Sequence, residues 1–293
     1  MFPVTGTGVA LVTPFTEALT LDLPALRRVV HHVVSGGVEA LVPLGTTGES
    51  TTLSLEEQYK VLDVVFEVNA GKLPVWVGCG GNDTRAVAAR MAELSARYPQ
   101  ATGFLSVSPA YNKPTQEGIV QHYRQLCSST DKPILLYNVP GRTATNLLPE
   151  TCYRLAADCP QVVGIKEASG NLDQNMDYVR LAPAGFSLLS GDDHLALAQV
   201  ALGFTGLISV VGNVAPAETA TLVRAALAGE LARARNLQYR LLPLIRLLFA
   251  EGNPAGAKAA LSVLGLCEPY VRLPLVPASP KLRADLTLAL RAV

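Results

Sequence analysis

The sequence predicts an α/β fold, a (β/α)8 or TIM barrel with an appended C-terminal helical layer, and two observations support this prediction. Eight short apolar runs rich in β-branched residues recur along the chain, and a helix-like stretch separates each run from the next. Strands that alternate with helices are typical of a parallel sheet, and eight such units can close into a barrel. Only helical patterns follow the eighth run, which predicts the extra layer.

The predicted strands are apolar almost continuously, as strands covered on both faces of a sheet must be. In chain order they are residues 8–13, 40–44, 75–78, 104–107, 134–137, 162–166, 187–190 and 206–210.

Helix starts and stops lie between these strands. Asp22 opens an amphipathic run that stops at residues 36–37, Ser54 and Glu57 form a capping box, and residues 82–84 open a third run. After the last strand we expect helices over residues 216–229, 231–250, 254–264 and 280–291. Residues 1–214 are therefore predicted to form the barrel with the active site, and residues 215–293 the eighth helix and the C-terminal extension.

A doubly wound open sheet is the alternative fold. It is disfavoured because the dinucleotide-binding fingerprint is missing: residues 6–8 precede a strand, and residues 78–81 lack the required glycine spacing.

Composition limits the class of protein. The chain has 293 residues, of which 49% are hydrophobic and 16% are charged, so a large core is expected and disorder is excluded. Basic and acidic residues number 24 each, which gives no reason to expect a nucleic-acid or membrane partner. The five cysteines are scattered, the N-terminus lacks the basic region of a secretory signal, and no apolar run could span a bilayer. We expect a cytoplasmic protein.

Lys166 is the most informative single residue. It is the only basic residue of a strand-like stretch, residues 162–169, and the residues of this stretch that precede it are apolar. Burial removes water from an ammonium group and favours the neutral amine, which is the nucleophile of Schiff-base enzymes. The structural alternative is a lysine that pairs with a carboxylate or extends to the strand end.

Further polar residues follow the predicted strands, at the barrel rim where active sites lie. The glycine-flanked turn of residues 45–50, which contains Thr46 and Thr47, is suited to a carboxylate but lacks the nucleotide-binding Gly-Lys-Ser/Thr ending. Strand alternation points Tyr137 into the barrel, either as a core tyrosine or as a proton shuttle beside Lys166. Arg142 could hold a substrate carboxylate, although a loop arginine is more often a solvated charge.

The remaining candidates are weaker. The four histidines have no spacing that gathers three ligands, so we predict no metal site. Asp192 and Asp193 are adjacent, and helix capping by one of them is the favoured interpretation.

With these residues in place, the chain resembles the dihydrodipicolinate synthase family of the class I pyruvate-dependent aldolases. The matching segments run nearly end to end; they are residues 8–15, 45–49, 108–118, 137–143, 164–168, 190–193 and 208–210. The resemblance implies condensation of pyruvate with L-aspartate 4-semialdehyde to 4-hydroxy-tetrahydrodipicolinate, in lysine and diaminopimelate biosynthesis. It also implies a homotetramer of barrels that needs no cofactor other than a covalent imine.

The resemblance assigns a role to each site residue. Lys166 is similar to the lysine that forms the imine, and Tyr137, Thr46 and Tyr111 to the proton relay, with Tyr111 reaching into the neighbouring subunit's site. Arg142 is similar to the residue that holds the carboxylate of the semialdehyde. The substrate-binding residues are Thr47, Ile208 and Gly191.

Two other functions share parts of this pattern. N-acetylneuraminate lyase and the 2-keto-3-deoxy sugar-acid aldolases would share Lys166 and Tyr137, but Arg142 and the Thr46–Thr47 pair favour the synthase. A non-catalytic barrel that serves as a binding module is disfavoured, because packing alone would not retain every relay hydroxyl.

One departure from the family pattern concerns regulation. Many bacterial members bind lysine with a tyrosine, two histidines and an acid, where this chain has Ala110, Leu55 with Gln58, and Ala86. Ser50 and Asn82 remain, although Asn82 is equally well explained as a helix cap. We therefore expect weak or absent inhibition by lysine.

Overall fold

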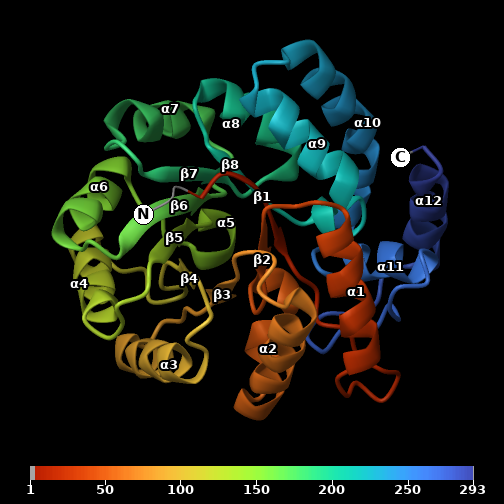
Figure 1. The fold of residues 1–293 in the computed structure, drawn as a ribbon, viewed down its shortest axis with the longest axis horizontal. Helices are drawn as coiled ribbons and strands as arrows, with labels where there is room; N and C mark the ends of the chain where they lie inside the picture. The colour runs from red at the N-terminus through yellow and green to blue at the C-terminus, as the bar shows by residue number, and fades with distance from the viewer. Residues whose placement is uncertain (1–3, 293) are drawn as a thin grey trace. The chain divides into compact units, whose positions relative to one another are not determined.

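The structure is a computed structural model that describes residues 4–292, and its elements are labelled in Figure 1. Eight strands are present in the described chain. They are β1 (Gly6–Ala10), β2 (Ala40–Val42), β3 (Trp76–Gly78), β4 (Gly103–Val107), β5 (Ile134–Asn138), β6 (Val162–Glu167), β7 (Ser187–Ser190) and β8 (Gly206–Ser209).

Helices occupy the connections between the strands. They are α1 (Leu23–Ser35), α2 (Leu55–Asn69), α3 (Thr84–Arg97), α4 (Gln116–Cys127), the one-turn α5 (Pro140–Thr143), α6 (Pro149–Asp158), α7 (Leu172–Leu181) and α8 (Ala196–Leu202). After β8 come α9 (Pro216–Leu227), α10 (Leu231–Ala250), α11 (Ala255–Val263) and α12 (Pro280–Leu290). The four predicted C-terminal helices are confirmed to within two residues at each end.

The order of the strands distinguishes a barrel from an open doubly wound sheet. That order is β2-β1-β8-β7-β6-β5-β4-β3, and the recorded strand pairs are parallel. The first strand therefore has the last strand as a neighbour, which a doubly wound order does not give. A further parallel bridge pairs Leu41 of β2 with Val75, directly before β3. The predicted (β/α)8 fold class with added C-terminal helices is confirmed.

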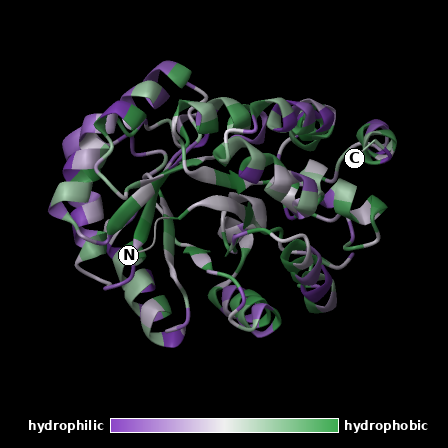
Figure 2. Ribbon diagram, turned by 45° about the horizontal axis from the view of Figure 1, so that its top comes forward, coloured by the Kyte–Doolittle hydropathy of each residue, from purple (hydrophilic) through white to green (hydrophobic). Residues whose placement is uncertain are grey.

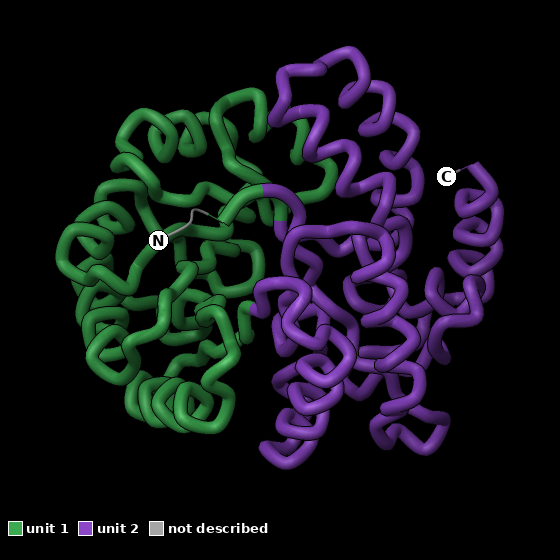
Figure 3. The backbone as a smooth tube through the Cα atoms, viewed as in Figure 1, with its two compact units in different colours: residues 1–5, 76–207 green, residues 6–75, 208–293 purple. Residues whose placement is uncertain are grey.

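The chain separates into two compact units, coloured in Figure 3. Of the described residues, unit 1 comprises residues 4–5 and 76–207, and unit 2 comprises residues 6–75 and 208–292. These units divide the chain differently from the predicted boundary after residue 214, which stays a prediction.

The helices form as their sequences predict. In α1 the Asp22 side chain accepts a hydrogen bond from the Ala25 amide, and the buried residues Leu26, Val29, Val30 and Val33 follow the spacing of one helix face. The capping box of Ser54 and Glu57 at α2 is complete. Figure 2 shows hydrophilic and hydrophobic residues side by side on most helices, as expected for helices with one buried face.

Two local predictions are wrong. The first strand ends at Ala10 rather than at Thr13, because the Val12 amide donates to the Asn213 side chain and the Thr13 hydroxyl donates to the Gly48 carbonyl. The cap of α3 is Asp83, whose carboxylate accepts from two backbone amides, and not Asn82.

Candidate active site

Lys166 and Tyr137 lie side by side in unit 1. They are register partners on the adjacent strands β6 and β5, so their side chains leave the sheet on the same face. Both are buried, with 6% and 7% of their surface exposed. The Lys166 Nζ atom lies 4.3 Å from the centroid of the Tyr137 ring. The structure therefore brings together the amine and the phenol that the sequence singled out.

Gly191 borders the Lys166 side chain. It follows β7, and its amide donates to the Glu167 carbonyl at 2.7 Å. A Cβ atom at this position would lie 3.0 Å from Lys166 Cε and 2.6 Å from Ala168 Cβ. Any larger residue would therefore crowd the lysine stem, which explains why glycine occupies this position.

The charge environment of Lys166 differs from that of an ordinary structural lysine. No salt bridge joins it to a carboxylate within the part of the chain that the structure describes. Burial raises the pKa of the Asp192 carboxyl, and electrostatic interactions with the His194 and Lys166 side chains oppose that increase. Asp192 lies at the N-cap position of a short 3-10 helix, but its side chain accepts no hydrogen bond from the backbone amides of that helix.

Arg142 and Tyr111 are the exposed residues among the predicted site residues of unit 1. Arg142 lies in the one-turn helix α5, and the Tyr111 amide donates to the carbonyl of Thr143 in that helix at 3.3 Å. Tyr111 has a positive φ of 70° and leaves 88% of its surface exposed. An exposed aromatic ring on a left-handed backbone is held there at some conformational cost, which is typical of functional loops.

Sequence reasoning missed the network on the opposite side of the same two strands. Asn138 and Glu167 follow Tyr137 and Lys166 in the chain and are also register partners. The Asn138 amide donates to the Glu167 carboxylate at 2.8 Å, and the Ser169 amide donates to its other oxygen at 2.6 Å. Burial raises the pKa of Glu167, while these hydrogen bonds oppose that increase. Polar residues paired at the ends of adjacent buried strands were the available signal.

Unit 2 contains the turn that carries Thr46 and Thr47. A 3-10 helix, η1 (Thr46–Gly48), forms here, and the Thr46 side chain is exposed while Thr47 is buried. The Thr47 hydroxyl accepts a hydrogen bond from the Asn253 amide at 2.9 Å, and the Thr13 hydroxyl donates to the Gly48 carbonyl at 2.8 Å. The turn is therefore fixed from two sides, and the first amides of such a helix have no acceptor within it.

Ile208 is the other predicted binding residue of unit 2. It lies in β8, is 2% exposed, and its Cγ1 atom is 3.6 Å from a Cβ built on Gly8 of β1. The structure thus places Lys166, Tyr137, Tyr111, Arg142 and Gly191 in unit 1, and Thr46, Thr47 and Ile208 in unit 2.

A buried ion pair in unit 2 was also missed. The Lys258 ammonium donates to the Glu49 carboxylate, and the two side chains are 0% and 2% exposed. The local signal was the same as for Lys166, because Lys258 is the lone basic residue of an apolar helix, α11.

Residues 4–292 lack two other kinds of site. They contain no group of three or more histidine, cysteine or acidic side chains that could hold a metal ion. No helix among them is long and apolar enough to cross a membrane.

Comparison with known proteins identifies the family. Residues 3–293 match the model of the Dihydrodipicolinate synthetase family. The chain is 48% identical to 4-hydroxy-tetrahydrodipicolinate synthase of Leptothrix cholodnii, over 99% of this chain and 98% of that protein. It is 46% identical to the same enzyme of Flavobacterium psychrophilum, over 97% and 96%.

A solved structure agrees with these matches. The dihydrodipicolinate synthase of Thermotoga maritima superposes with a TM-score of 0.95 at 44% identity, covering 99% of this chain and 98% of that one. The fold and these relatives define an enzyme of the (β/α)8-barrel class. The chain belongs to the dihydrodipicolinate synthase family.

Proposed function

We propose that this protein condenses pyruvate with L-aspartate 4-semialdehyde to give 4-hydroxy-tetrahydrodipicolinate, through a covalent imine on Lys166. The family membership and the names of relatives at 44–48% identity support this reaction. The single observation that carries the mechanism is the buried Lys166 amine, 4.3 Å from the Tyr137 ring and without a salt bridge in the described chain.

The first step forms the imine. The neutral Lys166 amine adds to the ketone carbon of pyruvate, and the hydroxyl of the resulting carbinolamine leaves as water after it gains a proton. The product is a positively charged imine, which withdraws electrons from the neighbouring methyl carbon. That methyl group can then lose a proton and become an enamine, so the covalent bond supplies the electron sink and no separate cofactor is needed.

The second step joins the two substrates. The enamine carbon attacks the aldehyde carbon of the semialdehyde, and the aldehyde oxygen gains a proton to become a hydroxyl. The amine of the semialdehyde then attacks the imine carbon, closes the ring and displaces Lys166 with both of its electrons. The free lysine amine is restored for the next cycle.

The remaining site residues supply protons and binding groups. Tyr137, Thr46 and Tyr111 form the proposed relay, since each step above moves a proton that bulk water would deliver more slowly. Arg142, which is exposed at the surface of unit 1, is proposed to bind the semialdehyde carboxylate through its guanidinium. Thr47, Ile208 and Gly191 are proposed to hold pyruvate.

The assembly and the location belong to the same proposal. We propose a homotetramer in which Tyr111 enters the neighbouring subunit's site, and the 88% exposure of Tyr111 on a strained loop supports that role. A cytoplasmic location is proposed because the reaction belongs to amino-acid biosynthesis, and the five cysteines, all buried thiols, are compatible with it.

Borohydride reduction in the presence of pyruvate tests the reaction. We expect pyruvate mass on the peptide that contains Lys166, and turnover when aspartate semialdehyde is supplied in a coupled assay. Sugar acids, offered as alternative substrates under the same conditions, should not turn over. An adduct on Lys166 with turnover of sugar acids alone would retain the imine chemistry and reject the proposed substrate.

A further inference from the structure

The buried ion pair of unit 2 is built around the turn that contains Thr46 and Thr47. Glu49 directly follows that turn, and its carboxylate has two donors: the Lys258 ammonium on one oxygen and the Arg272 backbone amide, at 2.9 Å, on the other. Lys258 also donates to the Tyr270 carbonyl at 2.9 Å. Each oxygen of the Glu49 carboxylate therefore accepts a hydrogen bond from the C-terminal part of the chain.

Glu49 needs this support because of its backbone. Its φ of 51° lies in the left-handed region, which a residue with a side chain adopts only when its surroundings enforce it. The Glu49 amide donates to the Thr46 carbonyl, so the conformation of Glu49 ends the 3-10 turn and sets the direction of the residues before it. Any movement of the Glu49 side chain would thus be transmitted to Thr46 and Thr47.

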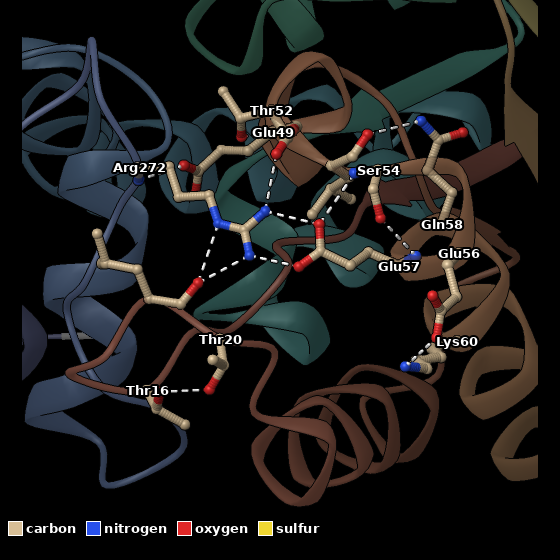
Figure 4. Close-up of polar contacts among 12 residues, drawn as sticks. Thr16, Thr20, Glu49, Thr52, Ser54, Glu56, Glu57, Gln58, Lys60 and Arg272 are labelled. Carbon is tan, nitrogen blue, oxygen red and sulfur yellow. Dashed lines mark hydrogen bonds and ion pairs between the residues drawn. The ribbon is translucent and has the colours of Figure 1, made fainter.

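The surrounding contacts hold the same segment at other points. Figure 4 shows the Arg272 guanidinium between Glu57 and the Thr52 carbonyl, close to Glu49. The centroid of the Phe15 ring lies 4.0 Å from the Lys258 ammonium and 4.3 Å from the central carbon of the Arg272 guanidinium. Both cations therefore contact the same aromatic ring.

We propose that Lys258 is a positioning residue, which holds Glu49 so that the turn of Thr46 and Thr47 is shaped to receive the carboxylate of the 2-oxo acid. Asn253, which donates to the Thr47 hydroxyl, is a second support from the same part of the chain. This inference rests on the proposed function. It gives the C-terminal helices a part in substrate binding that is separate from the covalent chemistry of Lys166.

A purely structural role is the competing explanation, and the energetics distinguish the two. Replacing both members of a buried ion pair by well-packed hydrophobic residues of similar volume is often neutral or stabilising, whereas removing one member leaves an uncompensated charge. A pair kept only for stability could therefore be replaced as a whole without functional loss. A pair kept for geometry could not.

Four variants test the proposal. Lys258→Met removes the cation, and Lys258→Met with Glu49→Gln removes both charges while the glutamine can still accept from the Arg272 amide. Asn253→Ala removes only the hydrogen bond to Thr47. Glu57→Gln is the matched control, because it weakens the Arg272 cluster without touching the Glu49 carboxylate. For each variant the KM for pyruvate, kcat, the melting temperature and the pyruvate dependence of borohydride trapping are measured.

We expect Lys258→Met and the double variant to raise the KM for pyruvate about tenfold, with a smaller change in kcat, since binding rather than chemistry is affected. The double variant should regain much of the lost thermal stability and keep the raised KM. Asn253→Ala should raise the KM about threefold, while Glu57→Gln should lower the melting temperature and leave the KM unchanged.

A double variant with the wild-type KM, or a KM that follows the melting temperature through all four variants, would overturn the proposal. If Lys258→Met alone does not fold, the double variant and Asn253→Ala decide. Failure of the proposed function is distinguishable, because the unmodified protein would then show no pyruvate adduct on Lys166.

Discussion

The two buried lysines make an instructive comparison. Lys166 in unit 1 and Lys258 in unit 2 are both buried, with 6% and 0% of their surface exposed. The Nζ atom of Lys166 lies 4.3 Å from the centroid of the Tyr137 ring, and that of Lys258 lies 4.0 Å from the centroid of the Phe15 ring. Lys258 has a carboxylate and a backbone carbonyl as acceptors, whereas Lys166 has no salt bridge in the described chain.

The difference lies in what each nitrogen can do. Burial lowers the pKa of Lys258, and the charge of Glu49 and its hydrogen bond oppose that decrease. The Lys258 nitrogen forms a buried ion pair with Glu49. An amine engaged by two acceptors cannot present a lone pair to a carbonyl carbon. A buried amine that faces a phenol can do so, and this contrast supports Lys166 as the nucleophile.

The largest expected effect comes from removing Lys166. Lys166→Ala should lower turnover by at least about 10³-fold, because the proposed imine forms on this amine, and should leave the melting temperature nearly unchanged. Lys258→Met should instead lower the unfolding free energy by about 3–5 kcal/mol, because Glu49 is left unpaired, and should change kcat much less than Lys166→Ala does. Turnover and thermal melts of both variants check this. Undiminished turnover by Lys166→Ala would remove the basis of the proposed mechanism.

The next largest effect is expected at the aromatic partner. Lys258 lies against a phenylalanine, Phe15, whereas Lys166 lies against a tyrosine. Tyr137→Phe removes the hydroxyl, so that both lysines then lie against a phenylalanine ring. We expect kcat to fall about 10²-fold, as for the loss of one proton-transfer group, while borohydride trapping of pyruvate persists at a reduced rate. Tyr178→Phe is the control, since it removes a buried hydroxyl that donates to the Leu147 carbonyl at 2.5 Å. Equal losses in both variants would indicate packing rather than proton transfer.

The two lysines also show how far sequence reasoning reaches. The strands and helices were predictable because apolar runs, caps and turn residues are local signals. Lys166 and Lys258 give the same local signal, a lone cation in an apolar element. What separates them is Glu49, which lies 209 residues from Lys258 in the chain, and no local pattern reports such a partner. The Asn138–Glu167 pair was missed for a similar reason. The register between β5 and β6 brings these two residues together, and the register is not a local feature of the sequence.

A smaller effect is expected from the acid dependence of the ion pair between Glu57 and Arg272. The hydrogen bond from Arg272 lowers the pKa of Glu57 from 4.5 to about 2. Ionised Glu57 therefore contributes stability above pH 4.5, and this contribution is lost as the pH falls toward 2. Glu57→Gln should cost about 1–2 kcal/mol at pH 7, reduced by its partial exposure, and progressively less below pH 4.5.

Urea unfolding between pH 7 and pH 3 measures this difference. Glu56→Gln is the matched control on the same helix turn, because its ion pair with Lys60 lies in solvent with side chains 76% and 51% exposed. It should change neither the stability nor its pH dependence. A Glu57→Gln penalty that stays constant down to pH 3 would contradict the assignment of the acid dependence to this carboxylate.

The smallest effect is expected from added lysine. A zwitterion is bound tightly only where charged or hydrogen-bonding groups replace its water, as Glu49 and the Tyr270 carbonyl do for Lys258. The positions that correspond to the family's lysine-binding side chains hold Ala110, Leu55 and Ala86, which offer no such groups. The fourth, Gln58, donates its side-chain amide to the Leu53 carbonyl at 3.2 Å and is partly committed within its own unit.

Steady-state assays with lysine at millimolar concentration should therefore show less than about twofold inhibition. Replacing Leu55 and Gln58 by histidine and Ala86 by glutamate should increase the inhibition, because these changes return a polar set for the ligand's charges. Potent inhibition of the unmodified protein would show that lysine binds through other groups. Since the buried Lys258 ammonium is held by specific acceptors, tight binding of free lysine would then require polar groups at other positions of the chain.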